Sequence, residues 1–238
     1  MTGLALATEV KPNQSIIELS DVTGLVAGMI IHISSDRLWY NGHRSAYYCG
    51  EIHKIAVVNA VGNTIELEDY TRDIYKLTDT LVITAWTPGR VRIKNIEFTA
   101  SAPATDVTSV CFAIQNCEYS ILENVTIRGF RQTGVLDSLG WNNKYSDLTI
   151  SMPSETDFVS STGYGVQTKG SVGTVVRGLV AYGLRRAFDA HSLSGTSLAA
   201  ISRDWVVKDF NVNGGTAWWP ETAESNYGIG SHGTSENG

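Results

Sequence analysis

The sequence predicts an all-β protein, a right-handed parallel β-helix (a solenoid) preceded by a small N-terminal β domain. The 238 residues include 23 glycines, 10 tyrosines and 6 tryptophans, and only 18% are charged. This composition favours strands and tight turns over helices. Short β-branched segments fill the first part of the chain, and two strand-like phrases recur in a fixed order through the rest. We expect the small domain at 1–90 and the β-helix at 91–238.

The first ninety residues read as a series of short strands. Turns containing glycine or proline separate segments that are rich in β-branched residues and mostly alternate between apolar and polar positions. These segments lie at 15–19, 29–33, 54–58 and 64–67. The stretch 38–48 is the longest predicted loop, and its aromatic and polar side chains suit either stacking on a sugar or packing on a neighbour.

From Arg90 onward, two phrases repeat. In the first, a polar residue and a turn residue precede an apolar–x–apolar triplet, whose first apolar residues are Ile96, Val125, Leu148, Leu179 and Phe210, at steps of 29, 23, 31 and 31 residues. The second is a small residue followed by an apolar one, which is Ile114, Val135, Val166, Phe188 and Ile229, at steps of 21, 31, 22 and 41. Interleaved phrases at an uneven period predict stacked coils with loops of varying length. A β-sandwich is the alternative, but it would not keep two phrases in fixed order.

The last three copies of the second phrase bring polar residues into one column. Strand side chains alternate between faces, so residues next to the inward apolar positions point outward. On this basis Gln167, Lys169, Asp189, His191 and His232 share one face. Neighbouring coils lie about 4.8 Å apart, so Lys169, His191 and His232 should form a ladder.

This column predicts an acid–base site. A carboxylate can orient or charge an imidazole, which titrates near neutrality, and a nearby cation can neutralise a sugar carboxylate. The catalytic candidates are therefore Lys169, Asp189, His191 and His232. The alternative is that these are ordinary solvated residues on an exposed sheet.

Residues that flank the column are candidates for substrate binding. Two arginines in the loop before the second copy supply positive charge suited to a uronate or another acidic sugar. The long insertion 214–226 carries a tryptophan pair, which suits either a sugar-stacking platform or a subunit interface. The predicted binding residues are Gln167, Arg185, Arg186, Trp218, Trp219, Glu221 and Glu224.

Other classes of function lack support. The net charge of −6 and the lack of a basic stretch argue against nucleic acid as a partner. Three cysteines match no zinc or disulfide framework, and we expect buried free thiols, no metal site and no cofactor. No apolar run approaches the roughly 20 residues of a membrane helix, and Met1–Lys11 lacks the features of a signal peptide.

One local motif resembles a known family. Phe188-Asp189-Ala190-His191 is similar to the Asp-Pro-His motif of mannuronan C-5 epimerases, which are right-handed β-helices. In that family the Asp and His belong to the catalytic centre, so the resemblance implies this role for Asp189 and His191. The sequence departs from the family where Ala190 replaces the proline and Ser192 replaces the acidic residue that follows.

The stretch from Arg90 to Gly238 resembles phage tailspike and pectate-lyase-superfamily proteins, in which apolar–Asp–x–His phrases recur on successive coils. Here the phrase occurs at 188–191 and, without the acid, at 229–232. The segment Gly28–Ser35 is similar to part of the small β domain that often precedes such a helix in phage proteins. The resemblance implies contact with a bacterial surface polysaccharide, assembly as a homotrimer or with other virion proteins, and a location in the phage tail or outside the cell.

The leading hypothesis is a tailspike-like depolymerase of an acidic bacterial surface glycan, with lyase-like chemistry favoured by the cationic, histidine-rich column. A hydrolase would need two carboxylates, and Asp189 with Glu221 or Glu224 is the pairing that the sequence offers. A non-catalytic adhesin or structural virion protein and a uronate C-5 epimerase are the alternatives. Because 231–238 reads as the middle of a coil, we expect the β-helix to be truncated at its C-terminal end.

Overall fold

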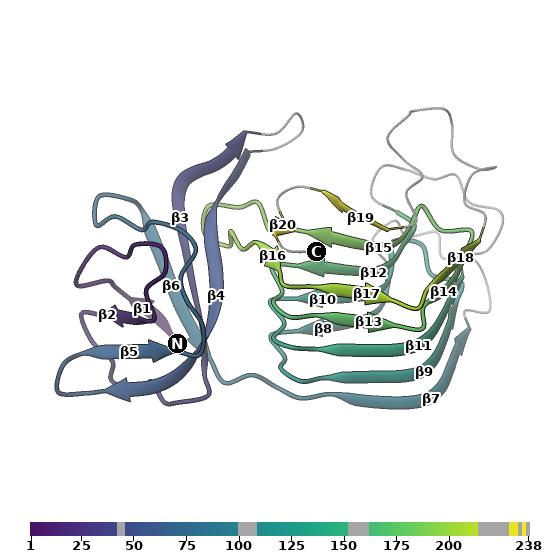
Figure 1. Ribbon diagram of the computed structural model, residues 1–238, viewed down its shortest axis with the longest axis horizontal. Coiled ribbons are helices and arrows are strands. Elements are labelled where there is room, and N and C mark those ends of the chain that lie inside the picture. The colour runs from purple at the N-terminus through teal and green to yellow at the C-terminus, as the bar shows by residue number, and fades with distance from the viewer. Residues whose placement is uncertain (42–45, 100–108, 152–161, 214–228, 233–234, 237–238) are drawn as a thin grey trace. The chain divides into compact units, whose positions relative to one another are not determined.

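The computed structural model describes residues 1–41, 46–99, 109–151, 162–213, 229–232 and 235–236. Residue contacts divide the chain into two compact units: Met1–Pro88 with Ser192–Ile201, and Gly89–His191 with Ser202–Gly238. Strands and turns make up the described part of both units (Figure 1). No helix in that part is long and apolar enough to cross a membrane. The predicted all-β class, a parallel β-helix preceded by a small β domain, is confirmed.

The N-terminal unit contains a six-stranded antiparallel sheet in the order β1-β6-β3-β4-β5-β2. The strands are β1 (Thr2–Leu4), β2 (Ile16–Glu18), β3 (Ile30–Asn41), β4 (Ala46–Asn59), β5 (Thr64–Leu67) and β6 (Leu81–Trp86). Their inward apolar side chains, among them Ile17, Ile33 and Ile65, form one core. All four strands predicted in this region are present.

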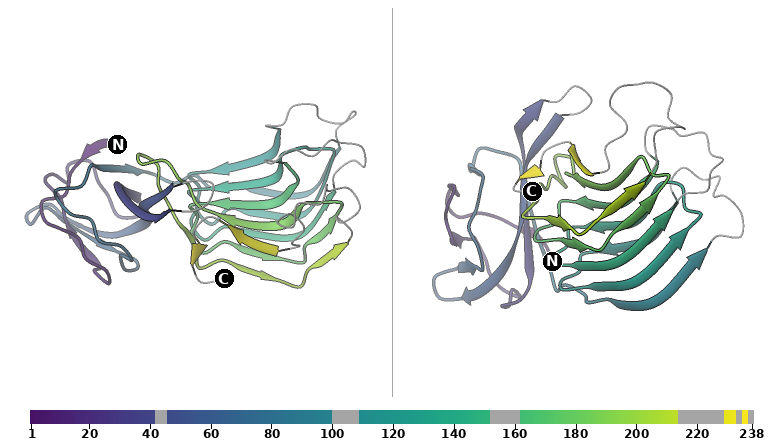
Figure 2. Two further views of the ribbon diagram at one scale, coloured as in Figure 1. Left: turned by 90° about the horizontal axis from the view of Figure 1, so that it is seen from above. Right: turned by 45° about the vertical axis from the view of Figure 1, so that its right-hand side comes forward.

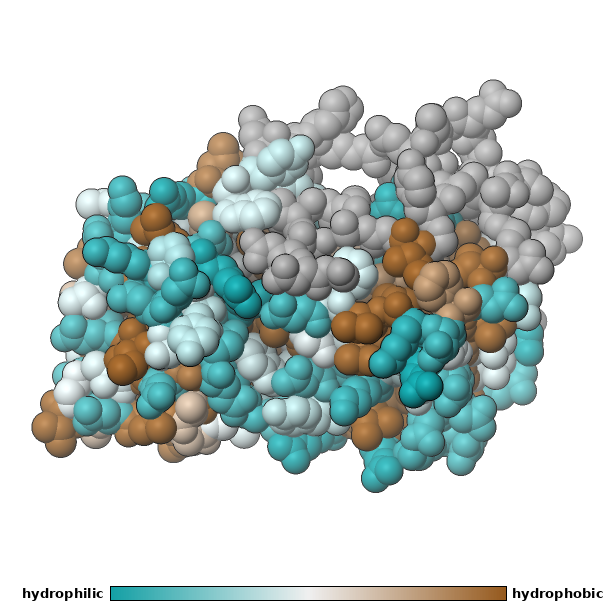
Figure 3. All heavy atoms as spheres, in the orientation of Figure 1, coloured by the Kyte–Doolittle hydropathy of each residue, from teal (hydrophilic) through white to brown (hydrophobic). Residues whose placement is uncertain are grey.

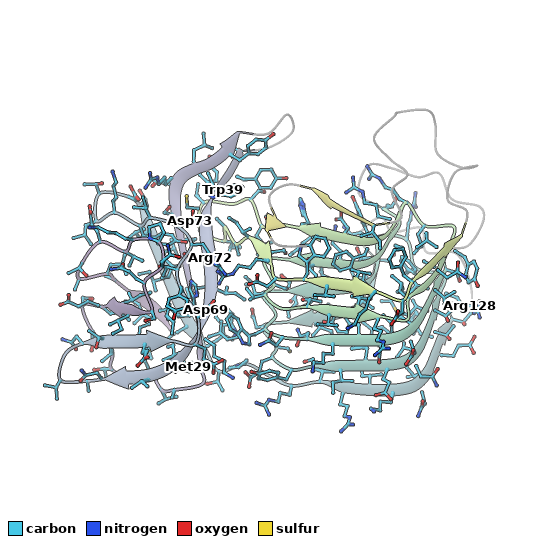
Figure 4. The ribbon with its side chains drawn as sticks, in the orientation of Figure 1. Met29, Trp39, Asp69, Arg72, Asp73 and Arg128 are labelled. Carbon is cyan, nitrogen blue, oxygen red and sulfur yellow. The ribbon has the colours of Figure 1, made fainter. Side chains whose placement is uncertain are left out.

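The predicted loop at 38–48 is wrong for the residues that the structure describes. Strand β3 continues to Asn41 and β4 begins at Ala46, so most of this stretch forms two arms of a hairpin. Trp39 lies on the first arm (Figure 4). Across the arms the rings of Tyr40 and Tyr47 lie 6.5 Å apart. Aromatic side chains favour strands and pair across them, which explains why an aromatic-rich segment extends the sheet.

The second unit is a parallel β-helix whose coils stack along one axis (Figure 2). The first phrase forms a seven-stranded sheet of β7 (Arg92–Thr99), β9 (Ile121–Arg128), β11 (Lys144–Ser151), β13 (Val175–Arg177), β14 (Val180–Tyr182), β17 (Val206–Lys208) and β18 (Asn211–Asn213). The second phrase forms a five-stranded sheet of β8 (Val110–Gln115), β10 (Thr133–Ser138), β12 (Tyr164–Lys169), β15 (Arg186–His191) and β19 (Ile229–His232). The short strands β16 (Ser202–Arg203) and β20 (Ser235–Glu236) pair separately.

A left-handed backbone residue recurs at the same place in the first phrase of each coil. The turn residue of each copy has φ between 53° and 68°, and these residues are Asn95, Asn124, Asp147, Gly178 and Asp209. Only Gly, Asn and Asp adopt this conformation routinely. The amide of Asn124 also donates to the side-chain oxygen of Asn95 over 2.8 Å. The residue types of the phrase therefore account for a bend that is repeated from coil to coil.

A buried carboxylate, Asp137, ties successive coils of the β-helix together. Asp137 is fully buried, and its two carboxylate oxygens accept hydrogen bonds from Asn143, Ser171 and Thr174 over 3.0, 3.1 and 2.8 Å. Burial raises the pKa of Asp137, and these hydrogen bonds oppose that shift. Ser171 and Thr174 belong to the coil after that of Asp137, so the carboxylate ties successive coils together.

Candidate functional site

The candidate site lies where β12, β15 and β19 run side by side. Parallel pairing places Gln167 opposite Asp189 and Lys169 opposite His191. The next pairing places His191 opposite His232, whose part in the site is defined by this backbone register. We call Gln167, Lys169, Asp189, His191 and this His232 position the polar column. The structure therefore has the strand register that the aligned phrases predict.

The two faces of these strands differ as alternation requires. Val166, Phe188 and Ala190 belong to the apolar core of the β-helix. Asp189 and Gln167 alternate with these core positions and so lie on the opposite face, yet they are 0% and 4% exposed. Lys169 and His191 are half-buried. The site is therefore largely shielded from solvent, which strengthens the electrostatic interactions within it.

Side chains at the same positions on earlier coils of this sheet are more exposed to solvent. On β8, Ala113 and Gln115 stand at the positions of Gln167 and Lys169 and are exposed. On the face seen in Figure 3, exposed apolar residues gather in places among the hydrophilic ones. Burial of its polar groups therefore distinguishes the candidate site from the earlier coils.

Asp189 is held on both of its carboxylate oxygens. Arg186 donates from Nη1 to Oδ1 over 2.6 Å, and Gln167 donates from Nε2 to Oδ2 over 2.7 Å. Both donors are buried, and the Arg186 contact is an ion pair. A buried carboxylate bonded in this way orients its partners, as a positioning residue does.

The two predicted arginines lie at the start of β15. The sequence placed both in a loop, but Arg186 is the first residue of the strand, and its backbone amide donates to the Gly163 carbonyl over 3.1 Å. Arg185 is also buried, with its guanidinium 5.7 Å from the centre of the Tyr164 ring and 3.3 Å from the Tyr164 hydroxyl. The guanidinium groups of Arg185 and Arg186 are thus held in place by Tyr164 and Asp189.

A third arginine, Arg131, was missed by sequence reasoning. Its carbonyl accepts the Gly163 amide over 2.9 Å, which places it one coil below Gly163 and two below Arg186. The sequence signal was a cation shortly before the second phrase on β10, as two arginines come shortly before the phrase on β15. We call Arg131, Arg185 and Arg186 the arginine edge.

Burial perturbs the acid–base behaviour of Lys169 in the polar column. Burial lowers the pKa of its ammonium group, and the nearby Asp189 carboxylate opposes this shift. The backbone at the strand ends is tied down, because the His191 carbonyl accepts the Ser202 hydroxyl over 2.6 Å and the Gly170 amide over 3.3 Å. An amine with a lowered pKa beside an imidazole position suits proton transfer.

Four predicted binding residues lie outside the described part of the chain: Trp218, Trp219, Glu221 and Glu224. Within the described part, no group of three or more histidine, cysteine, aspartate or glutamate side chains is arranged to hold a metal ion. Roles for these four residues stay predictions, as do the catalytic and binding roles of the other predicted residues.

Comparison with known proteins gives a fold-level match. No family model and no curated protein matches the sequence. Among solved structures, tailspike gp61 of Pseudomonas phage phi297 is similar with a TM-score of 0.69 and 16% identity, over 87% of this chain and 33% of that one. The tailspike protein gp49 of Pseudomonas phage LKA1 is similar with a TM-score of 0.66 and 17% identity, over 86% of this chain and 33% of that one.

These similarities establish the fold. The chain has the parallel β-helix fold of phage tailspike proteins, and it spans about a third of the length of the two tailspike chains that it matches. At 16–17% identity, site residues do not carry over from those proteins. The chemistry must therefore be argued from the polar column itself.

Proposed function

We propose that this chain is the glycan-handling part of a tailspike-like protein, and that it binds and depolymerises an acidic bacterial surface polysaccharide by lyase-like chemistry. The observation that carries the proposal is the register of β12 and β15, which sets the amine of Lys169 and the imidazole of His191 on adjacent strands at the same level. The fold shared with phage tailspikes supports a glycan as the substrate class and the phage tail as the location.

In the proposed lyase reaction, the polar column removes a proton from the sugar, and the arginine edge stabilises the charge that develops. Lys169 in its neutral form takes the proton from the sugar carbon next to the uronate carboxylate. The electrons of that C–H bond form the new C=C double bond, the neighbouring C–O bond breaks, and the departing oxygen takes a proton from solvent. A guanidinium of the arginine edge stabilises the negative charge that develops on the carboxylate.

The remaining residues assist this chemistry. Asp189 holds Arg186 and Gln167 in place through its two hydrogen bonds. His191 lies opposite Lys169 in register and offers a second group that can donate or accept a proton. Because burial lowers the pKa of Lys169 below its ordinary 10.5, more of its amine is in the basic form at a given pH.

A binding-only function is the second candidate, and one observation favours it. Asp189 is fully buried and both of its oxygens are already bonded, so the acid of the column is not positioned to exchange protons with a substrate. In that case the polar column stabilises a glycan-binding surface without cleaving the polymer.

Incubation with a panel of acidic bacterial polysaccharides distinguishes the functions. We expect the polymer to shorten, with new ultraviolet absorbance from the unsaturated product. Shortening without this absorbance would indicate hydrolysis, and a change of sugar stereochemistry at constant length would indicate epimerisation. Binding at constant length and stereochemistry would support the adhesin.

A further inference from the structure

One segment leaves the β-helix and packs elsewhere. Ser192–Ile201 follows β15, and its contacts place it in the same compact unit as Met1–Pro88. Ala199 and Ala200 are 0% exposed. Leu193 and Ala200 exchange backbone hydrogen bonds of 2.9 and 3.3 Å, which close the segment into a small hairpin. We call Ser192–Ile201 the docking segment.

Strands β3 and β4 hold the docking segment by three contacts. His32 Nε2 lies 2.6 Å from the Ala199 carbonyl, and since a carbonyl only accepts, this nitrogen carries the proton. The Ile201 amide donates to the Gly50 carbonyl over 3.0 Å. At Gly50 the Ala199 carbonyl occupies the space that a Cβ would fill, so this close approach requires glycine.

The docking segment begins directly after the polar column, and the residue that follows it is bonded back to the column. The residue before it is His191, and the residue after it is Ser202. The Ser202 hydroxyl donates to the His191 carbonyl over 2.6 Å and accepts the Gly170 amide, next to Lys169, over 2.9 Å. Fixing the docking segment therefore restrains the chain on either side of the His191–Ser202 contact.

We propose that docking of Ser192–Ile201 onto β3 and β4 positions His191, so that His32 and Gly50 act as positioning residues for the polar column. The inference rests on the proposed function of that column. The physical reason is entropic, because a ten-residue segment released from its contacts becomes a mobile loop attached directly to His191.

Hydrogen exchange of the full chain tests the docking. His32→Ala removes the donor to Ala199, and His32→Gln keeps an N–H that can reach the same carbonyl. We expect the Ala200 and Ile201 amides to exchange up to about tenfold faster in His32→Ala, the effect of one lost buried hydrogen bond, and to recover in His32→Gln. Equal exchange in all three proteins would overturn the inference.

Two glycine substitutions test the same docking by steric clash, one as the test and the other as its control. Gly50→Ala places a methyl group against the Ala199 carbonyl, whereas a Cβ at Gly195, in the docking segment itself, meets nothing within 4 Å. We expect faster exchange of Ile201 in Gly50→Ala and no change in Gly195→Ala. If Gly50→Ala does not fold, the His32 pair still decides the question.

Two readouts at the polar column separate this inference from the proposed function. The titration midpoint of His191, followed by NMR, should shift in His32→Ala and not in Gly195→Ala, whether or not a glycan is cleaved. If the wild type cleaves glycan, kcat should fall in His32→Ala with KM unchanged. A wild type without cleavage would refute the enzymatic proposal alone, whereas an unchanged His191 midpoint despite faster exchange would refute the positioning role.

Discussion

Asp189→Asn tests the role that the structure gives to Asp189. The substitution keeps the shape of the side chain, but it removes the charge that pairs with buried Arg186 and replaces one acceptor oxygen by a donor. Breaking a buried ion pair by removing one partner costs about 3–5 kcal/mol. For a chain of 150–250 residues each kcal/mol lowers Tm by about 2–4 °C, so we expect a loss of about 6–20 °C.

The chain offers a matched control in Asp209→Asn. Asp209 also pairs with an arginine, Arg177 at 2.8 Å, but both side chains are more than half exposed. Asparagine tolerates the left-handed backbone at this position, and an exposed pair contributes about 0–1 kcal/mol. Thermal unfolding followed by circular dichroism should show a small shift for Asp209→Asn and a large one for Asp189→Asn.

Equal, small changes of Tm in both variants would refute the claim that the buried Arg186–Asp189 ion pair stabilises the fold. The result also governs how activity is interpreted. If Asp189→Asn is strongly destabilised, its loss of activity does not identify Asp189 as a proton donor or acceptor. Activity must then be compared at a temperature where both variants are folded.

Three further predictions follow from buried groups. Asp137→Ala should cost at least about 3 kcal/mol, because three donors lose their acceptor, whereas Asp137→Asn should cost less in urea unfolding. Because burial lowers the pKa of His32 below 6.5, the unfolded chain takes up a proton first as pH falls, so stability should decline below pH 6.5 and His32→Gln should reduce that slope. Burial raises the pKa of Cys49 and Cys111 to about 12, so both thiols should resist alkylation at pH 8 until the protein is unfolded, which mass spectrometry can measure.

The strand architecture could be predicted because its signals are local. Each copy of the first phrase carries Asn, Asp or Gly at the bend, and each copy of the second carries a small residue before its inward apolar one. Once the coils stack in parallel, equal positions in the phrase must pair. The pairing of Lys169 with His191 across neighbouring strands then follows from the sequence alone.

Burial and long-range contacts could not be predicted in the same way. Arg186 bonds to Asp189 three residues away, which strand alternation does not indicate. The docking segment depends on Gly50 and on His32, which lies 167 residues before its partner Ala199, and neither carries a local signal of that partner. Asp137 was not predicted as a buried carboxylate, although its strand register places it opposite the inward Thr168.

The most direct test of the central claim compares two lysine variants on a polysaccharide that the wild type cleaves. Lys169→Gln removes the proposed base of the polar column, and Lys144→Gln removes an exposed lysine of the other sheet. The account predicts a fall of about 10²–10⁴-fold in the rate of ultraviolet-absorbing product for Lys169→Gln, with wild-type stability and glycan binding, and no change for Lys144→Gln. Equal rates in the two variants would contradict it.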